Sequence, residues 1–110
     1  MATIPVTVMV RSDGIDVNPT YANVRNGSED VQLRWIAIGG TFPEADFFWW
    51  KNSPVGAPAV SRVSASVMES ATYKNDASEQ RVWAYAVKIV KPDDTDATID
   101  PEINNEPPTG

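Results

Sequence analysis

Residues 80–90 read QRVWAYAVKIV, and this stretch decides the fold class. Large apolar side chains occupy every second position, at Trp83, Tyr85, Val87 and Ile89. The alternate positions hold smaller or polar side chains, at Val82, Ala84, Ala86 and Lys88. A period of two with aromatic and β-branched residues predicts a long strand that is buried on one side and lightly covered on the other.

The segment that follows, ATIDPEINNEP at residues 97–107, predicts a last strand beside residues 80–90. Ile99 and Ile103 are four residues apart and therefore lie on the same side of an extended chain. Pro101 has no amide hydrogen to donate, so strand pairing should change or end there. We expect the two isoleucines to face the core and the acidic residues between them to face solvent.

Two further stretches alternate strongly, residues 4–10 and the sequence DVQLRWIAI at residues 30–38. Trp35 in the second stretch and Trp83 occupy the apolar parity, so both are predicted in the core. Residues 59–74 fit either two short strands or a short helix; frequent Ser and β-branched residues without a capping box favour strands.

About seven short strands separated by turn residues predict an all-β protein, specifically an antiparallel two-sheet β-sandwich. The length of 110 residues indicates one domain. We expect residues 1-104 to form this sandwich domain and residues 105-110 to form a frayed, acidic and Pro-rich tail.

The chain contains no Cys and no His. Disulfides, thiolate chemistry, the commonest metal ligand and the commonest general base are therefore excluded. Its serines have neither a His to activate them nor a G-x-S-x-G turn. We accordingly expect no enzyme activity, and we assign no catalytic residue, no cofactor-binding residue and no metal ligand.

The net charge of −6 comes entirely from the residues after Lys91. Such an acidic end repels phosphate, so no nucleic acid partner is expected. No apolar run is long enough to cross a membrane and no signal peptide is recognisable, which predicts no membrane partner and a cytoplasmic location. The acidic spacing does not match a calcium loop, and a solvated strand end is the expected role.

The steps Asp100-Pro101 and Glu106-Pro107, behind the strand sequence WAYAV, resemble the small bacterial single-domain proteins of the DP-EP family. The resemblance is specific over about the last third of the chain. It implies a compact immunoglobulin-like or cupredoxin-like β-sandwich, and it supplies no catalytic residues. Without His or Cys, a cupredoxin-like domain cannot hold copper.

The aromatic run Phe47, Phe48, Trp49 and Trp50 is the candidate interaction face. In a strand these residues split into two pairs on opposite faces, so one pair can enter the core. The other pair could be covered by the loop NSPVGAP, form a homo-oligomer or protein-docking surface, or stack on a small ligand. We therefore expect a non-catalytic interaction or structural module that self-associates or docks a protein; the alternative is a small-ligand domain, with carbohydrate as one candidate.

Overall fold

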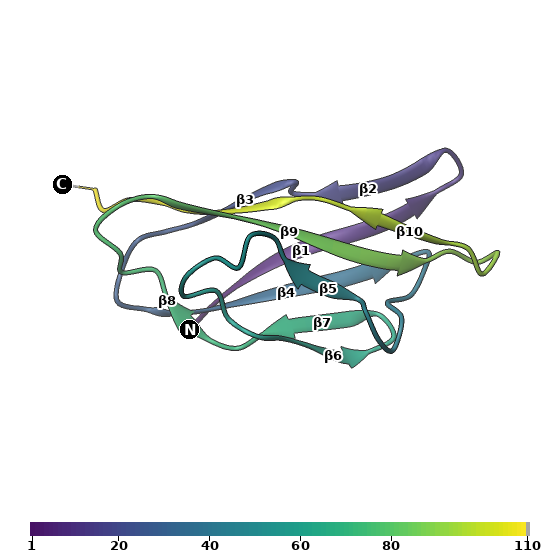
Figure 1. Ribbon diagram of the computed structural model, residues 1–110, viewed down its shortest axis with the longest axis horizontal. Coiled ribbons are helices and arrows are strands. Elements are labelled where there is room, and N and C mark those ends of the chain that lie inside the picture. Colours follow the sequence, from purple (N-terminus) through teal and green to yellow (C-terminus); the bar gives the residue numbers. More distant parts are fainter. Residues whose placement is uncertain (110) are drawn as a thin grey trace.

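The computed structural model describes residues 1–109 of the chain, which form eleven strands (Figure 1). This range contains no helix, so no helix in it could span a membrane. The strands are β1 (Ala2–Arg11), β2 (Gly14–Asn18), β3 (Tyr21–Val24), β4 (Asp30–Ile38), β5 (Phe48–Trp50), β6 (Val60–Ser64), β7 (Val67–Ser70), β8 (Tyr73–Lys74), β9 (Arg81–Val90), β10 (Asp96–Ile99) and β11 (Glu102–Asn105).

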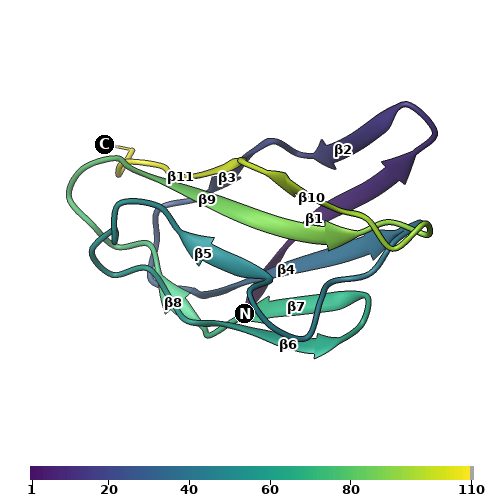
Figure 2. The ribbon, with the colours of Figure 1, turned by 45° about the vertical axis from the view of Figure 1, so that its right-hand side comes forward.

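The strands form two open sheets that pack face to face (Figures 1 and 2). The first sheet has the order β2-β1-β4-β7-β6, with β8 also paired to β4. In the second sheet β9 is central: β5 pairs with one edge, β10 and β11 share the other edge, and β3 lies beside β11. The all-β, two-sheet prediction is confirmed. The predicted seven strands are wrong, because turns and prolines divide several long runs into separate short strands.

The prediction of purely antiparallel sheets is also wrong, since both sheets are mixed. β1 runs parallel to β4, with Ile4 opposite Leu33, and β3 runs parallel to β11. After β2 the chain crosses to the second sheet as β3 and returns as β4, in the same direction as β1. A parallel pair needs such a crossover, and side-chain alternation carries no information about strand direction.

β10 and β11 are two parts of one extended segment, residues 96–105. Ile99 pairs with Val87, and Ile103 pairs with Trp83, so the register against β9 is the same on both sides of Pro101. The amide of Tyr85 donates to the carbonyl oxygen of Pro101 at 3.1 Å. The predicted docking of this segment beside residues 80–90 is confirmed, and Pro101 interrupts it only by lacking a donor.

The core between the sheets combines aliphatic side chains with a cluster of contacting aromatic rings. Trp35 is 0% exposed and Trp83 is 5% exposed, which confirms the prediction for both. The indole Nε1 of Trp35 donates to the hydroxyl oxygen of Tyr85 at 3.0 Å, so this pair is hydrogen-bonded as well as packed. We call the contacting rings the inner aromatic cluster: Trp35, Phe48, Trp50, Tyr73, Trp83 and Tyr85.

Residues 59–74 form strands rather than a helix, as the Ser and β-branched content favoured. β6 and β7 make an antiparallel pair with an irregularity between Arg62 and Ser64. β7 pairs with the second half of β4, and β8 pairs with the first two residues of β4, where Tyr73 lies opposite Val31. This placement brings Tyr73 into the inner aromatic cluster, 5.1 Å from the Trp83 ring centroid.

Candidate binding face

The candidate residues Phe47 to Trp50 do not form one surface. In β5, Phe48 and Trp50 face the first sheet; the ring of Phe48 lies 4.9 Å from that of Trp35. The indole Nε1 of Trp50 donates to the carbonyl oxygen of Pro58 at 2.7 Å, so the loop after β5 covers this ring. Trp49 points the opposite way and is 43% exposed.

Phe47, immediately before β5, is half-buried and packs against the core cluster. Its carbonyl oxygen accepts a hydrogen bond from the amide of Lys88 at 3.0 Å, which extends the pairing of β5 with β9. The aromatic run therefore contributes one well-exposed ring, Trp49, to the outside of the second sheet.

Trp49 lies opposite Ala86 in the ladder between β5 and β9. The side chain of Ala86 points to the outside of the second sheet, yet it is only 1% exposed. The ammonium of Lys51 lies 2.9 Å from a carboxylate oxygen of Asp100. Lys51 follows β5 and Asp100 follows β10, so the two residues lie on either side of β9. Only small side chains at Ala84 and Ala86 leave room for this ion pair to pass over β9.

Tyr21 on β3 lies at the far side of the same surface. It pairs with Glu102 of β11 and is 42% exposed. Trp49 and Tyr21 are three strand spacings apart, about 14 Å. We call the outward side chains of β3, β5, β9, β10 and β11, together with those of the residues that directly follow β5 and β10, the outer face: Tyr21, Asn23, Trp49, Lys51, Val82, Ala84, Ala86, Lys88, Asp96, Thr98, Asp100, Glu102 and Asn104.

A row of hydrogen-bonded amides crosses one end of the outer face. Gln80 Nε2 donates to Asn104 Oδ1 at 2.6 Å, and Asn104 Nδ2 donates to Asn23 Oδ1 at 2.9 Å. Asn104 is 7% exposed, so its orientation is fixed by its neighbours. The row therefore holds its two end groups, the Oε1 of Gln80 and the Nδ2 of Asn23, in defined positions.

Charges of both signs are interspersed on the outer face. Besides the Lys51–Asp100 pair, the ammonium of Lys88 lies 4.0 Å from a carboxylate oxygen of Asp96. These pairs are exposed and contribute about 1 kcal/mol or less each to stability. Their importance is for recognition: the pairs supply hydrogen-bond donors and acceptors near Trp49, and their opposite charges largely cancel.

Sequence reasoning missed Tyr21, Lys51 and Asp100 as members of this surface. Tyr21 reaches it only through the parallel pairing of β3 with β11, which joins residues 81 positions apart. One local signal was present: Ala84 and Ala86 occupy the outward positions of the strongest strand, where long polar side chains would be usual.

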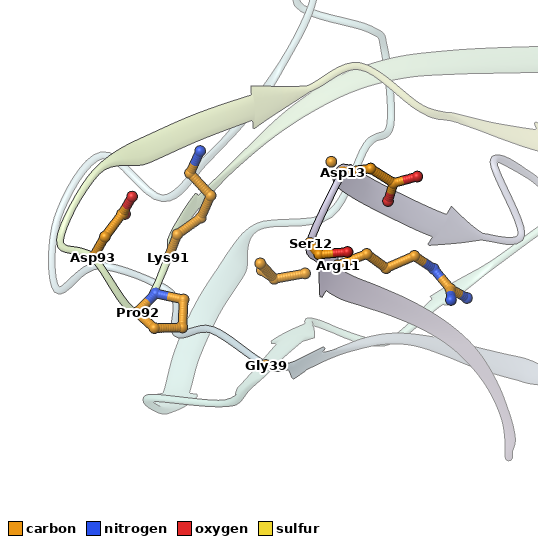
Figure 3. Close-up of a pocket in the computed structure, with 9 residues that line it drawn as sticks. Arg11, Ser12, Asp13, Gly39, Lys91, Pro92 and Asp93 are labelled. Atoms are coloured by element: carbon orange, nitrogen blue, oxygen red, sulfur yellow. The ribbon is translucent and has the colours of Figure 1, made fainter.

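A hollow of about 630 Å³ lies elsewhere, at the end of the molecule where β1 turns into β2 (Figure 3). Arg11, Ser12 and Asp13 form one wall, and Lys91 lies on the other. Figure 3 shows the side chains of Arg11 and Lys91 pointing away from each other. Arg11 is paired with Asp16, so the two cations do not converge on a common ligand position.

The shifted pKa values belong to groups outside the outer face. Burial raises the pKa of Tyr73, and burial raises the pKa of Tyr85 to about 12 against the hydrogen bond from Trp35. Hydrogen bonds from the Thr95 hydroxyl and amide lower the pKa of Asp93. Within residues 1–109 no three carboxylates come together as a metal site would require.

No protein-family model and no curated protein matches this chain. The likeness of its Asp-Pro and Glu-Pro steps to the DP-EP family therefore stays a prediction.

Proposed function

We propose that this chain is a non-catalytic binding domain that recognises neutral carbohydrate through the outer face, with Trp49 as the stacking platform. The observation that carries the proposal is the position of Trp49. It is the one tryptophan of four among the strongly exposed apolar residues, and it lies beside the Lys51–Asp100 pair. An exposed aromatic ring flanked by fixed donors and acceptors suits a ligand that has both apolar ring faces and hydroxyl groups.

The exposed rings of the outer face offer little area for the first hypothesis, self-association or protein docking through the aromatic run. Fully burying one aromatic side chain covers about 150–250 Å². With Trp49 and Tyr21 each less than half exposed, the two rings offer roughly 200 Å² together. A stable protein interface buries about 800 Å² of total surface per partner, of which roughly 450 Å² is apolar. The two rings would supply less than half of that apolar area, and we therefore favour the carbohydrate hypothesis.

We further propose that the fold is an immunoglobulin-like or cupredoxin-like sandwich of the DP-EP type. Two open sheets around an aromatic core support this assignment, as does the C-terminal segment that carries Asp100-Pro101 and Glu106-Pro107.

The test is retardation of the purified protein in native gels that contain hydroxyethyl cellulose, soluble starch or galactomannan. Polygalacturonate, an anionic polymer, is the matched control. We expect at least one neutral polymer to retard the protein and to change its tryptophan emission, because Trp49 is the ring that a ligand can reach. Absence of retardation by all three neutral polymers, or retardation by polygalacturonate alone, would overturn the proposal.

A further inference from the structure

Asn105, the last residue of β11, is a buried amide whose hydrogen bonding is incomplete. Its side chain points inward like that of Ile103 and is 2% exposed. Its Oδ1 accepts a hydrogen bond from the hydroxyl of Tyr73 at 2.8 Å. Its Nδ2 is the one buried side-chain nitrogen or oxygen within residues 1–109 that has no hydrogen-bond partner. A buried donor without an acceptor is costly, so a group that would accept from Asn105 is to be sought nearby.

Asn105 lies on the wall of a hollow of about 150 Å³. Tyr73 from the first sheet and Trp83 from the second also line it, and their ring centroids are 5.1 Å apart. Val55 and Gly56, in the loop after β5, complete the wall. Figures 1 and 2 show β8 and the start of β9 at the same end of the molecule as the C-terminus. A hollow of this volume accommodates a single six-membered ring.

The loop side of the hollow is weakly held. The amide of Ala57 donates to the carbonyl oxygen of Pro54 at 3.5 Å, a long hydrogen bond that closes the turn carrying Val55 and Gly56. The side chain of Val55 is 79% exposed, so it contributes little packing. A ligand can therefore reach the shielded Nδ2 of Asn105 by displacing this turn, without separating any strand.

The charges around the hollow largely cancel. Its charged lining residues are Lys74, Asp76 and Arg81. The ammonium of Lys74 lies 2.9 Å from a carboxylate oxygen of Asp30, which leaves one cation and one anion, Arg81 and Asp76. Because neither sign predominates, the hollow favours a neutral ligand over an ion.

We propose that the hollow beside Asn105 binds a small, neutral, planar ring that carries a carbonyl oxygen, such as a monocyclic amide. The carbonyl oxygen would accept from the Nδ2 of Asn105, and the ring would pack against Trp83 and Tyr73. A water molecule satisfies the donor equally well but gains nothing from the aromatic rings. The hollow shares no residue with the outer face, so the inference is independent of carbohydrate binding.

The test uses the full chain labelled with ¹⁵N and two probes of equal ring size, 2-pyridone and benzene. We expect 2-pyridone to cause saturable shifts centred on the side-chain amide of Asn105 and the indole N–H of Trp83. Benzene has no acceptor, so it should bind at least about tenfold more weakly. Absence of saturable shifts with 2-pyridone would leave water as the partner of Asn105 and overturn the proposal. Equal affinity for the two probes, or shifts centred on Trp49, would also overturn it.

A pair of variants assigns the preference to the Asn105 amide. Asn105→Leu removes the donor at similar volume, and it should weaken 2-pyridone binding at least about tenfold while leaving benzene binding unchanged. Asn104→Leu is the matched control, because it removes a neighbouring amide that points to the outer face, and it should leave 2-pyridone binding unchanged. Equal 2-pyridone affinities for the two variants would contradict the proposal. If Asn105→Leu loses its dispersed spectrum, the wild-type preference for 2-pyridone over benzene decides alone.

Discussion

Trp49 and Trp50 are neighbours in the chain, yet they belong to different chemical environments. Trp50 packs into the inner aromatic cluster, 5.5 Å from the Trp83 ring centroid, and its indole nitrogen is hydrogen-bonded to the loop after β5. Trp49 lies on the outer face, opposite Ala86 and beside the Lys51–Asp100 ion pair. The comparison shows that successive residues of one strand have different roles, because their side chains alternate between the two faces. The side chains that point inward stabilise the fold, and those that point outward are available for binding.

Truncating one residue on each face of β9 tests most directly whether the two faces differ in their contribution to stability. Trp83→Ala should lower the free energy of unfolding by about 3–5 kcal/mol, because it leaves a large cavity among packed rings. Val82→Ala, on the outer face, should lower it by less than about 1 kcal/mol. Urea unfolding of both variants measures the difference. Equal losses would show that the two faces do not differ as described.

The buried hydroxyl of Tyr85 predicts a loss of stability in alkali. Burial raises its pKa to about 12 in the folded state from the ordinary value of 10.0, so the folded state keeps a proton that the unfolded state releases. The contribution of this group is complete below pH 10 and is lost as the pH rises toward 12, by up to about 2–3 kcal/mol. Urea unfolding across this range, with Tyr85→Phe as the reference, isolates the effect; parallel curves for the two proteins would contradict it.

The Lys51–Asp100 ion pair should matter least for stability. Both side chains are well exposed, so Lys51→Met should change the free energy of unfolding by about 1 kcal/mol or less. The matched variant is Lys88→Met, which removes the longer pair to Asp96. A loss of several kcal/mol for Lys51→Met would mean that the outer face supports the fold as strongly as the inner face does.

Side-chain parity was the part of the fold that the sequence could predict. It placed Trp35 and Trp83 in the core and Ile103 on the inner side of the last strand, where it is 0% exposed. It also predicted that Trp49 and Trp50 face opposite ways. Which of the two faces outward was not predictable, because that depends on how β5 docks on β9 and on the loop that covers Trp50.

The sequence pattern could not predict which distant segments pair as strands. The parallel pairs β1–β4 and β3–β11 follow from where the chain crosses between sheets, and alternation is the same for either direction. For this reason Tyr21 could not be placed beside Glu102. The binding surfaces arise from those pairings and not from local motifs.

The measurement that tests the central claim most directly is the affinity of Trp49→Ala for whichever neutral polymer retards the wild-type protein, with its thermal melting recorded on the same preparation. The outer position of Trp49 predicts at least about tenfold weaker binding with a melting temperature within about 5 °C of wild type. Trp50→Ala is the matched variant, and it should melt far lower. Unchanged affinity in a folded Trp49→Ala protein would contradict the account.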